Sequence, residues 1–221
     1  MGPTIAIALL WLGFAASHMG LSSLRVRPRL VARMGEGPFL GFYSLVSFLF
    51  FVPLVWVYLA HRHAGPWLWA VPMTTPVRWA VNVAMGVAFV LLVAGFARPS
   101  PASFRGGAPT ARGVQRITRH PVFMAFGILG LAHLVPNGSA ADVAFFGGFP
   151  LFAVIGARHQ DQRKLATGGA SFRAFHEATP FLPFTGRATL RGIREMPPLV
   201  IGAGVVLAVA VRYAHPLWFG R

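Results

Sequence analysis

The chain has 221 residues and a mass of 23.8 kDa, which is the size of one domain. Hydrophobic residues make up 55% of the sequence and charged residues only 11%, whereas a typical globular chain carries about 25% charged residues. This composition excludes a disordered tail, a collagen-like polymer and an ordinary cytosolic enzyme. The sequence therefore predicts an all-α polytopic membrane protein, with residues 1–221 forming a single transmembrane domain.

The sequence contains no cysteine. Disulfides, thiolate metal sites, iron–sulfur clusters and cysteine nucleophiles are therefore excluded, and any metal ligand must come from His, Met, Tyr or a carboxylate. The formal net charge is +15. Such a charge on a soluble protein would suggest nucleic acid, but membrane topology explains it here, and we expect no nucleic-acid partner.

A helix needs roughly 20 residues to cross about 30 Å of hydrocarbon. Six apolar runs in the sequence have this length or are somewhat shorter. They predict about six transmembrane helices, at 3–24, 38–60, 79–97, 121–135, 143–157 and 199–211. Residues 162–195 place bulky apolar side chains among cations, which predicts a partly helical amphipathic segment in the cytoplasmic interface. Gly168-Gly169 is expected to separate this segment from the fifth span.

The basic residues alternate between the two sides of these spans. The stretches 25–36, 98–119 and 158–198 hold 16 of the 20 Lys and Arg residues, and the opposite side holds four. Cytoplasmic loops of membrane proteins are enriched in Lys and Arg. The pattern therefore predicts that both termini lie on the non-cytoplasmic side and that the lipid bilayer is the main partner.

Motifs of soluble enzymes are missing from the sequence. It contains no P-loop, HExxH or G-x-S-x-G motif, and residues 202–204 (GAG) lie in an apolar run that favours helix packing. All acidic residues are expected in loops, which argues against acid–base chemistry on paired carboxylates: Glu36, Asp142, Asp161, Glu177 and Glu195.

Histidines are the remaining candidates for chemistry, because an ionisable side chain within a membrane span is costly and often functional. His18 and His133 lie within predicted spans, and His120 and His159 lie at the cytoplasmic ends of the fourth and fifth. For His18 and His133 two interpretations compete: a core imidazole bonded to a neighbouring span, or an axial ligand of haem iron. The other four are expected to be solvated or interfacial: His61, His63, His176 and His215.

The depth of the two span histidines differs. His18 is expected roughly 9 Å from the cytoplasmic end of its span and His133 roughly 20 Å. An offset of about 11 Å requires a tilted porphyrin or tilted helices. Judged by its expected depth, His120 is the alternative second axial ligand.

A dense polar cluster precedes the fourth span, and Pro121 suits the first turn of a helix there. Arg116, Arg119 and His120 lie beside this helix start. They predict an anion site for phosphate, carboxylate or a haem propionate. The alternative interpretation is ordinary positive-inside charge.

Five blocks in the chain resemble the NnrU family. They are 30–36 (LVARMGE), 41–47 (GFYSLVS), 116–121 (RITRHP), 130–133 (GLAH) and 156–161 (GARHQD). The resemblance implies a bacterial inner-membrane protein associated with denitrification. The family is similar to plant zeta-carotene isomerase, a membrane protein that binds haem b through two histidines.

Carried over residue by residue, this resemblance implies that His18 and His133 are the iron ligands and catalytic residues. His61, His120 and His159 match other histidines shared with that enzyme. With the anion cluster, the expected cofactor-binding set is His18, His133, Arg116, Arg119, His120 and His159. The expected activity is haem-dependent isomerase or oxidoreductase chemistry on a small or lipophilic substrate such as a polyene.

A second resemblance points to integral-membrane methyltransferases of the isoprenylcysteine and phospholipid type. It rests on Arg119-His120-Pro121 before a span and on the basic segment with residues 172–175 (FRAF) and 180–183 (PFLP). Those enzymes hold S-adenosylmethionine with the His of the R-H-P element and a pair of Glu residues. Here the matching region is 159–162 (HQDQ), without that pair, which counts against the activity.

Three functional classes therefore stay open. The first is the haem b isomerase or oxidoreductase, and the second is the methyltransferase. The third is a non-catalytic assembly or transport factor for nitrogen-oxide respiration, whose partner would be a respiratory complex.

Overall fold

The computed structural model describes residues 2–103 and 110–219. Its elements are α1 (Gly2–Leu21), α2 (Val26–Met34), α3 (Glu36–Ala60), α4 (Thr75–Ala97), the 3-10 helix η1 (Gly113–Arg116), α5 (Pro121–Leu134), α6 (Ala140–Thr167), α7 (Gly169–Ala178), α8 (Thr189–Glu195) and α9 (Pro198–Phe219). The one pairing of extended backbone in these ranges is an isolated bridge between Trp67 and Ser139. The prediction of an all-α protein is confirmed.

Each predicted span corresponds to a helix. Helices α1, α3, α4, α6 and α9 are long and apolar enough to cross a membrane, and α5 is a shorter apolar helix. Helix α6 runs to Thr167 instead of ending near residue 157, because polar residues continue it until Gly169, whose φ of +65° ends the helical path. The loop expected at 25–36 contains α2.

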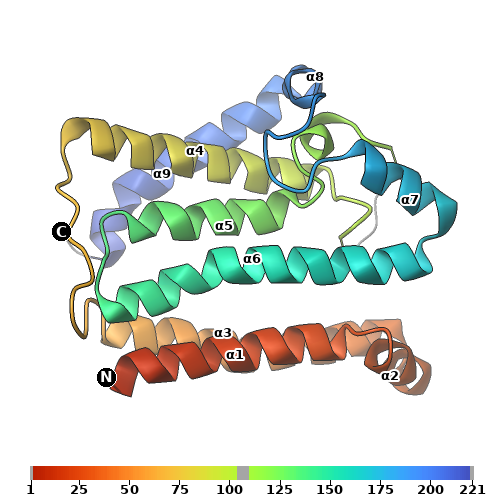
Figure 1. The fold of residues 1–221 in the computed structure, drawn as a ribbon, viewed down its shortest axis with the longest axis horizontal. Helices are drawn as coiled ribbons and strands as arrows, with labels where there is room; N and C mark the ends of the chain where they lie inside the picture. Colours follow the sequence, from red (N-terminus) through yellow and green to blue (C-terminus); the bar gives the residue numbers. More distant parts are fainter. Residues whose placement is uncertain (1, 104–109, 220–221) are drawn as a thin grey trace.

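Helix α6 is the centre of the bundle (Figure 1). On one side it packs against α1, which pairs with α3, and on the other against α5, which packs on α4 and through it on α9. The described parts of the three basic stretches gather at one end of the bundle, where α2, α7 and α8 lie. Both ends of the chain lie at the opposite end (Figure 1).

The predicted interfacial segment is partly helical and divides into α7 and α8. Phe172 and Phe175 on α7 are buried against Ala102 within the protein. Leu182 and Phe184, in the connection between the two helices, are exposed. The apolar side chains of this segment therefore divide between a small protein core and the surface.

Close helix contacts depend on glycine at two places. The indole of Trp11 on α1 donates to the carbonyl of Phe145 on α6 at 3.0 Å and lies over Gly148 so closely that a Cβ there would overlap it. Gly204 on α9 packs against the backbone of Val90 on α4. The predicted helix contact at residues 202–204 is confirmed at this glycine.

The buried carboxylate of Asp142 anchors the first turn of α6. Ser139 and Asp142 form a capping box at the helix start. Asp142 also accepts from Tyr58 at 3.0 Å and pairs with His63 at 2.9 Å, which connects α3 and the following loop to α6. The expectation that the acidic residues lie in loops is wrong, because each lies within a helix: Glu36 in α3, Asp142 and Asp161 in α6, Glu177 in α7 and Glu195 in α8.

The contact between α1 and α6 predicts different effects for two neighbouring glycines. Gly148→Ala should destabilise the protein by about 1–3 kcal/mol, because the new methyl group overlaps Trp11. Gly147→Ala is the matched control, since no atom lies within 4 Å of the place that its Cβ would occupy, and alanine favours a helix over glycine. Thermal unfolding in detergent measures both, and equal melting temperatures would contradict the assigned contact.

Candidate functional site

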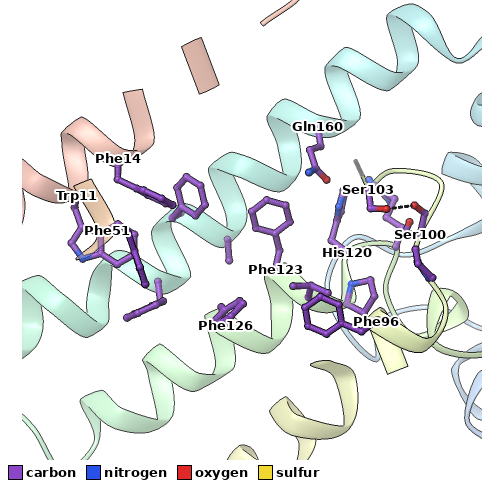
Figure 2. A pocket seen from close by; sticks show the side chains of 18 residues that line it. Trp11, Phe14, Phe51, Phe96, Ser100, Ser103, His120, Phe123, Phe126 and Gln160 are labelled. Carbon is purple, nitrogen blue, oxygen red and sulfur yellow. Dashed lines mark hydrogen bonds between the residues drawn. The ribbon is translucent and has the colours of Figure 1, made fainter. Parts of the chain in front are cut away.

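An elongated cavity of about 680 Å³ lies beside α6, between the α1–α3 pair and the α4–α5 pair (Figure 2). We call it the aromatic pocket, because eight of its 18 lining residues are Trp or Phe: Trp11, Phe14, Phe51, Phe96, Phe123, Phe126, Phe149 and Phe152. One end is more polar and contains Ser100, Ser103, Arg119, His120 and Gln160. Figure 2 shows Trp11, Phe14 and Phe51 at one end of the pocket and His120 with Gln160 toward the other.

The pocket suits a long apolar molecule. Along α6 its wall runs from Phe149 to Gln160, which corresponds to about 16 Å of helix. Phe96 and Phe126 line the pocket and are exposed, so the pocket is open at these two side chains. The volume lies within the usual range for small-molecule sites, about 300–1,000 Å³.

The polar end is organised by a buried carboxylate. Asp161 on α6 binds the guanidinium of Arg119 through Oδ2, at 2.9 Å from Nε and 2.8 Å from Nη2. Its Oδ1 is 2.8 Å from Nε2 of His120. Arg119 also donates to the carbonyl of Thr179 at 2.7 Å, and its guanidinium lies over the ring of Phe181. This network connects the segment before α5, α6 and the segment after α7.

Among the described residues, His120 is the histidine that lines the pocket. Burial lowers the pKa of its imidazole, although Asp161 acts in the opposite direction. The ring is therefore neutral near neutral pH. Because the carboxylate of Asp161 accepts the hydrogen bond, the proton is assigned to Nε2 and the lone pair to Nδ1.

Arg116 and His159 bind other partners. Arg116 donates from Nε to Glu195 at 2.9 Å and so connects η1 to α8. The backbone N–H of Gly113 donates to the same oxygen of Glu195, and these bonds hold the pKa of that carboxyl at about 2. His159 bonds to the hydroxyl of Ser22 at 3.1 Å. Of the predicted anion cluster, Arg119 and His120 line the pocket, and Arg116 does not.

The structure does not bring His18 and His133 together. Each lies in the last turn of its helix, and α1 and α5 run in opposite directions along α6. His18 bonds to Ser47 at 3.2 Å and lies beside Phe152. His133 donates to the carbonyl of its own helix and stacks on Phe146.

The two axial ligands of one haem must face each other across the porphyrin. The neighbours of His18 and His133 on α6 are six positions apart, which is about 9 Å along the helix and on different sides of it. In this structure the two imidazoles bond to the hydroxyl of Ser47 and to the carbonyl of Leu129, and not to a shared partner. In the described ranges, no group of three or more His, Cys, Asp or Glu side chains is placed to hold a metal ion.

Asp161 is the functional residue that sequence reasoning misplaces. The apolar run ends at Arg158, which predicts a loop from there onward, but helix α6 continues through Asp161. The signal that could have found it is the lack of a helix breaker before Gly168. Both carboxylate oxygens of Asp161 are occupied by Arg119 and His120.

Comparison with known proteins identifies relatives over the whole chain. The family model described as NnrU protein matches residues 6–221. The 15-cis-zeta-carotene isomerase of Arabidopsis thaliana chloroplasts is 28% identical over 236 aligned positions, covering 99% of this chain and 61% of the relative. The enzyme of the same name from Zea mays is 26% identical, with 96% and 60% covered. The chain thus spans about three fifths of these relatives, and no solved structure matches it.

Removing the charge of Asp161 should destabilise the whole polar end. Asp161→Asn leaves Arg119 buried without its counter-charge, which we expect to cost about 3–5 kcal/mol of folding free energy. The control is Glu177→Gln, because this carboxylate is exposed on α7. Thermal unfolding in detergent measures both variants. A melting temperature for Asp161→Asn equal to that of the control would show that the network contributes little.

The separation of His18 and His133 predicts how added haem b will behave. Haem b added to the purified protein should not give a low-spin spectrum that depends on both His18 and His133, because the two imidazoles lie on helices that run in opposite directions and bond to separate partners. A low-spin Soret band that is lost in both single variants would contradict the arrangement described here.

Proposed function

Because the chain belongs to the NnrU family, we propose that it is a membrane isomerase that acts on the double bonds of a long apolar polyene. The relatives named 15-cis-zeta-carotene isomerase support this class of reaction. The observation that carries the proposal is the aromatic pocket, whose volume, length and wall suit such a substrate. A cis polyene is almost entirely apolar and is dissolved in the bilayer, which is where Phe96 and Phe126 are exposed.

The pocket side chains have two roles in this proposal. The aromatic rings bind the polyene by burying its apolar surface and exclude water from it. The network of Asp161, Arg119 and His120 closes the more polar end and positions one neutral imidazole there. His120 then presents a neutral imidazole in the pocket wall, with the lone pair of Nδ1 as a hydrogen-bond acceptor.

The proposed location is a bacterial inner membrane, with the end that holds α2, α7 and α8 toward the cytoplasm. The concentration of Lys and Arg at this end supports the orientation, because cytoplasmic ends of membrane proteins are rich in these residues. The pocket then lies within the membrane, with its more polar end near the cytoplasmic surface.

Phenylalanine-to-alanine variants test where the substrate binds. Membranes from cells that produce the protein should convert 15-cis-zeta-carotene to a trans isomer, measured by liquid chromatography. Phe126→Ala removes part of the pocket wall, and because Phe126 is 41% exposed, we expect a loss of about 1 kcal/mol of binding, or about fivefold in apparent affinity. Phe48→Ala is the matched control, since this exposed ring lies on α3 away from the pocket.

Two results would contradict the proposal. If wild-type membranes leave the cis polyene unchanged and the purified protein does not bind it, the isomerase assignment is wrong. If Phe126→Ala and Phe48→Ala convert it with the same apparent affinity, the substrate does not occupy the aromatic pocket.

A further inference from the structure

A second group of charges lies at the basic end of the bundle, on α2 and in the last turns of α6. Arg27 belongs to α2, and Arg163 and Lys164 belong to α6. Their positive charges lie close enough to repel one another. We call these three residues the cationic corner. None of them belongs to the wall of the aromatic pocket.

The cationic corner lacks negative charge. Glu36 is the acidic residue that reaches it, and its largely exposed carboxylate bonds to Arg27 at 2.8 Å. The remaining acidic residues bind elsewhere or lie exposed on α7: Asp142, Asp161, Glu177 and Glu195. Within the described ranges, one carboxylate therefore serves three cations.

Arg163 is the residue of the cationic corner whose positive charge is least compensated by neighbouring groups. Its side chain is partly buried, and its Nε is fully enclosed without a hydrogen-bond partner. Among the described residues its guanidinium makes no hydrogen bond or ion pair. A charged group removed from water without a counter-charge is unfavourable, and a guanidinium binds a phosphate group through two parallel hydrogen bonds. The chemistry of the corner thus calls for an anion with several acceptor oxygens.

Two neutral hydrogen-bonding side chains, Tyr43 and His159, lie near Arg163. Tyr43 of α3 lies near both Arg27 and Arg163, and its hydroxyl contacts the carbonyl of His18 near the end of α1 at 3.4 Å. One turn before Arg163 on α6, His159 bonds to the hydroxyl of Ser22. The corner is therefore built from four helices, α1, α2, α3 and α6, and is not a run of mobile surface side chains.

The depth of the corner matches the headgroup layer of a bilayer. It lies beyond the end of α1 at Leu21 and beside the start of α3 at Glu36, and both helices are long enough to cross a membrane. Figure 1 shows this end of α6 next to α2. Basic sites between transmembrane helices at the cytoplasmic surface bind anionic headgroups.

We propose that the cationic corner binds the phosphate group of an anionic phospholipid, with Arg163 as its principal ligand. Arg27 and Lys164 add charge, and the lipid's acyl chains lie along the exposed apolar faces of α1 and α3. This site is independent of the isomerase proposal, because it uses none of the pocket residues. Its occupancy can therefore be measured without any substrate.

Native mass spectrometry of the full-length protein in detergent tests the site. Phosphatidylglycerol should remain bound to the wild type in preference to phosphatidylcholine, and Arg163→Gln should reduce the retained fraction about fivefold or more, the contribution of one Arg next to an anionic headgroup. Arg173→Gln is the matched control, because it removes the same charge from an exposed position on α7. Equal retention in the two variants, or equal retention of the two lipids, would overturn the proposal.

Inorganic phosphate distinguishes the two possible sources of the phosphate group. If millimolar phosphate displaces phosphatidylglycerol from the wild type, the corner binds a free phosphate group as well. If it does not, the acyl chains contribute and the lipid is the ligand. Should Arg163→Gln fail to purify as a single species, Lys164→Gln replaces it. A smaller but clear loss of phosphatidylglycerol in that variant supports the site, and full retention overturns it.

Discussion

The buried carboxylate of Asp161 is the interaction on which the candidate site depends. It binds Arg119 and His120, which precede α5, and so fixes the start of that helix against α6. In a region of low dielectric constant such a pair is stable only when every member is bonded. The carbonyl of Thr179 accepts a further hydrogen bond from Nη1 of Arg119. This network closes the aromatic pocket at its more polar end, on the side nearest the polar surface.

Helix α6 gives each part of the protein its place. Its first turn is anchored by Asp142, its middle turns form the long wall of the aromatic pocket, and its last turns carry Arg163. An elongated apolar ligand and a lipid headgroup would therefore contact the same helix at different depths. This arrangement explains why one helix contains both the aromatic side chains and the polar residues that a simple membrane span would avoid.

Several features could be predicted from the sequence because they depend on local physics. Long apolar runs must form helices in a membrane, where each backbone group has to be satisfied within its own segment. This reasoning locates every span, but it ends α6 too early, because hydropathy falls at Arg158 although the helix continues. Asp161 is consequently assigned to a loop. The estimated depths of His18 and His133 already differ by about 11 Å, and the directions of α1 and α5 explain that difference.

The sequence by itself determined the helical class, the six apolar helices and the separation of the basic stretches from the opposite side. These follow from composition and from distances along one helix. Only the tertiary structure decided which histidine lines a cavity, which carboxylate is buried between Arg119 and His120, and which arginine, among the described residues, has an enclosed Nε without a hydrogen-bond partner. Those outcomes depend on how helices far apart in the chain pack side by side, and no pattern within a single helix specifies its neighbours.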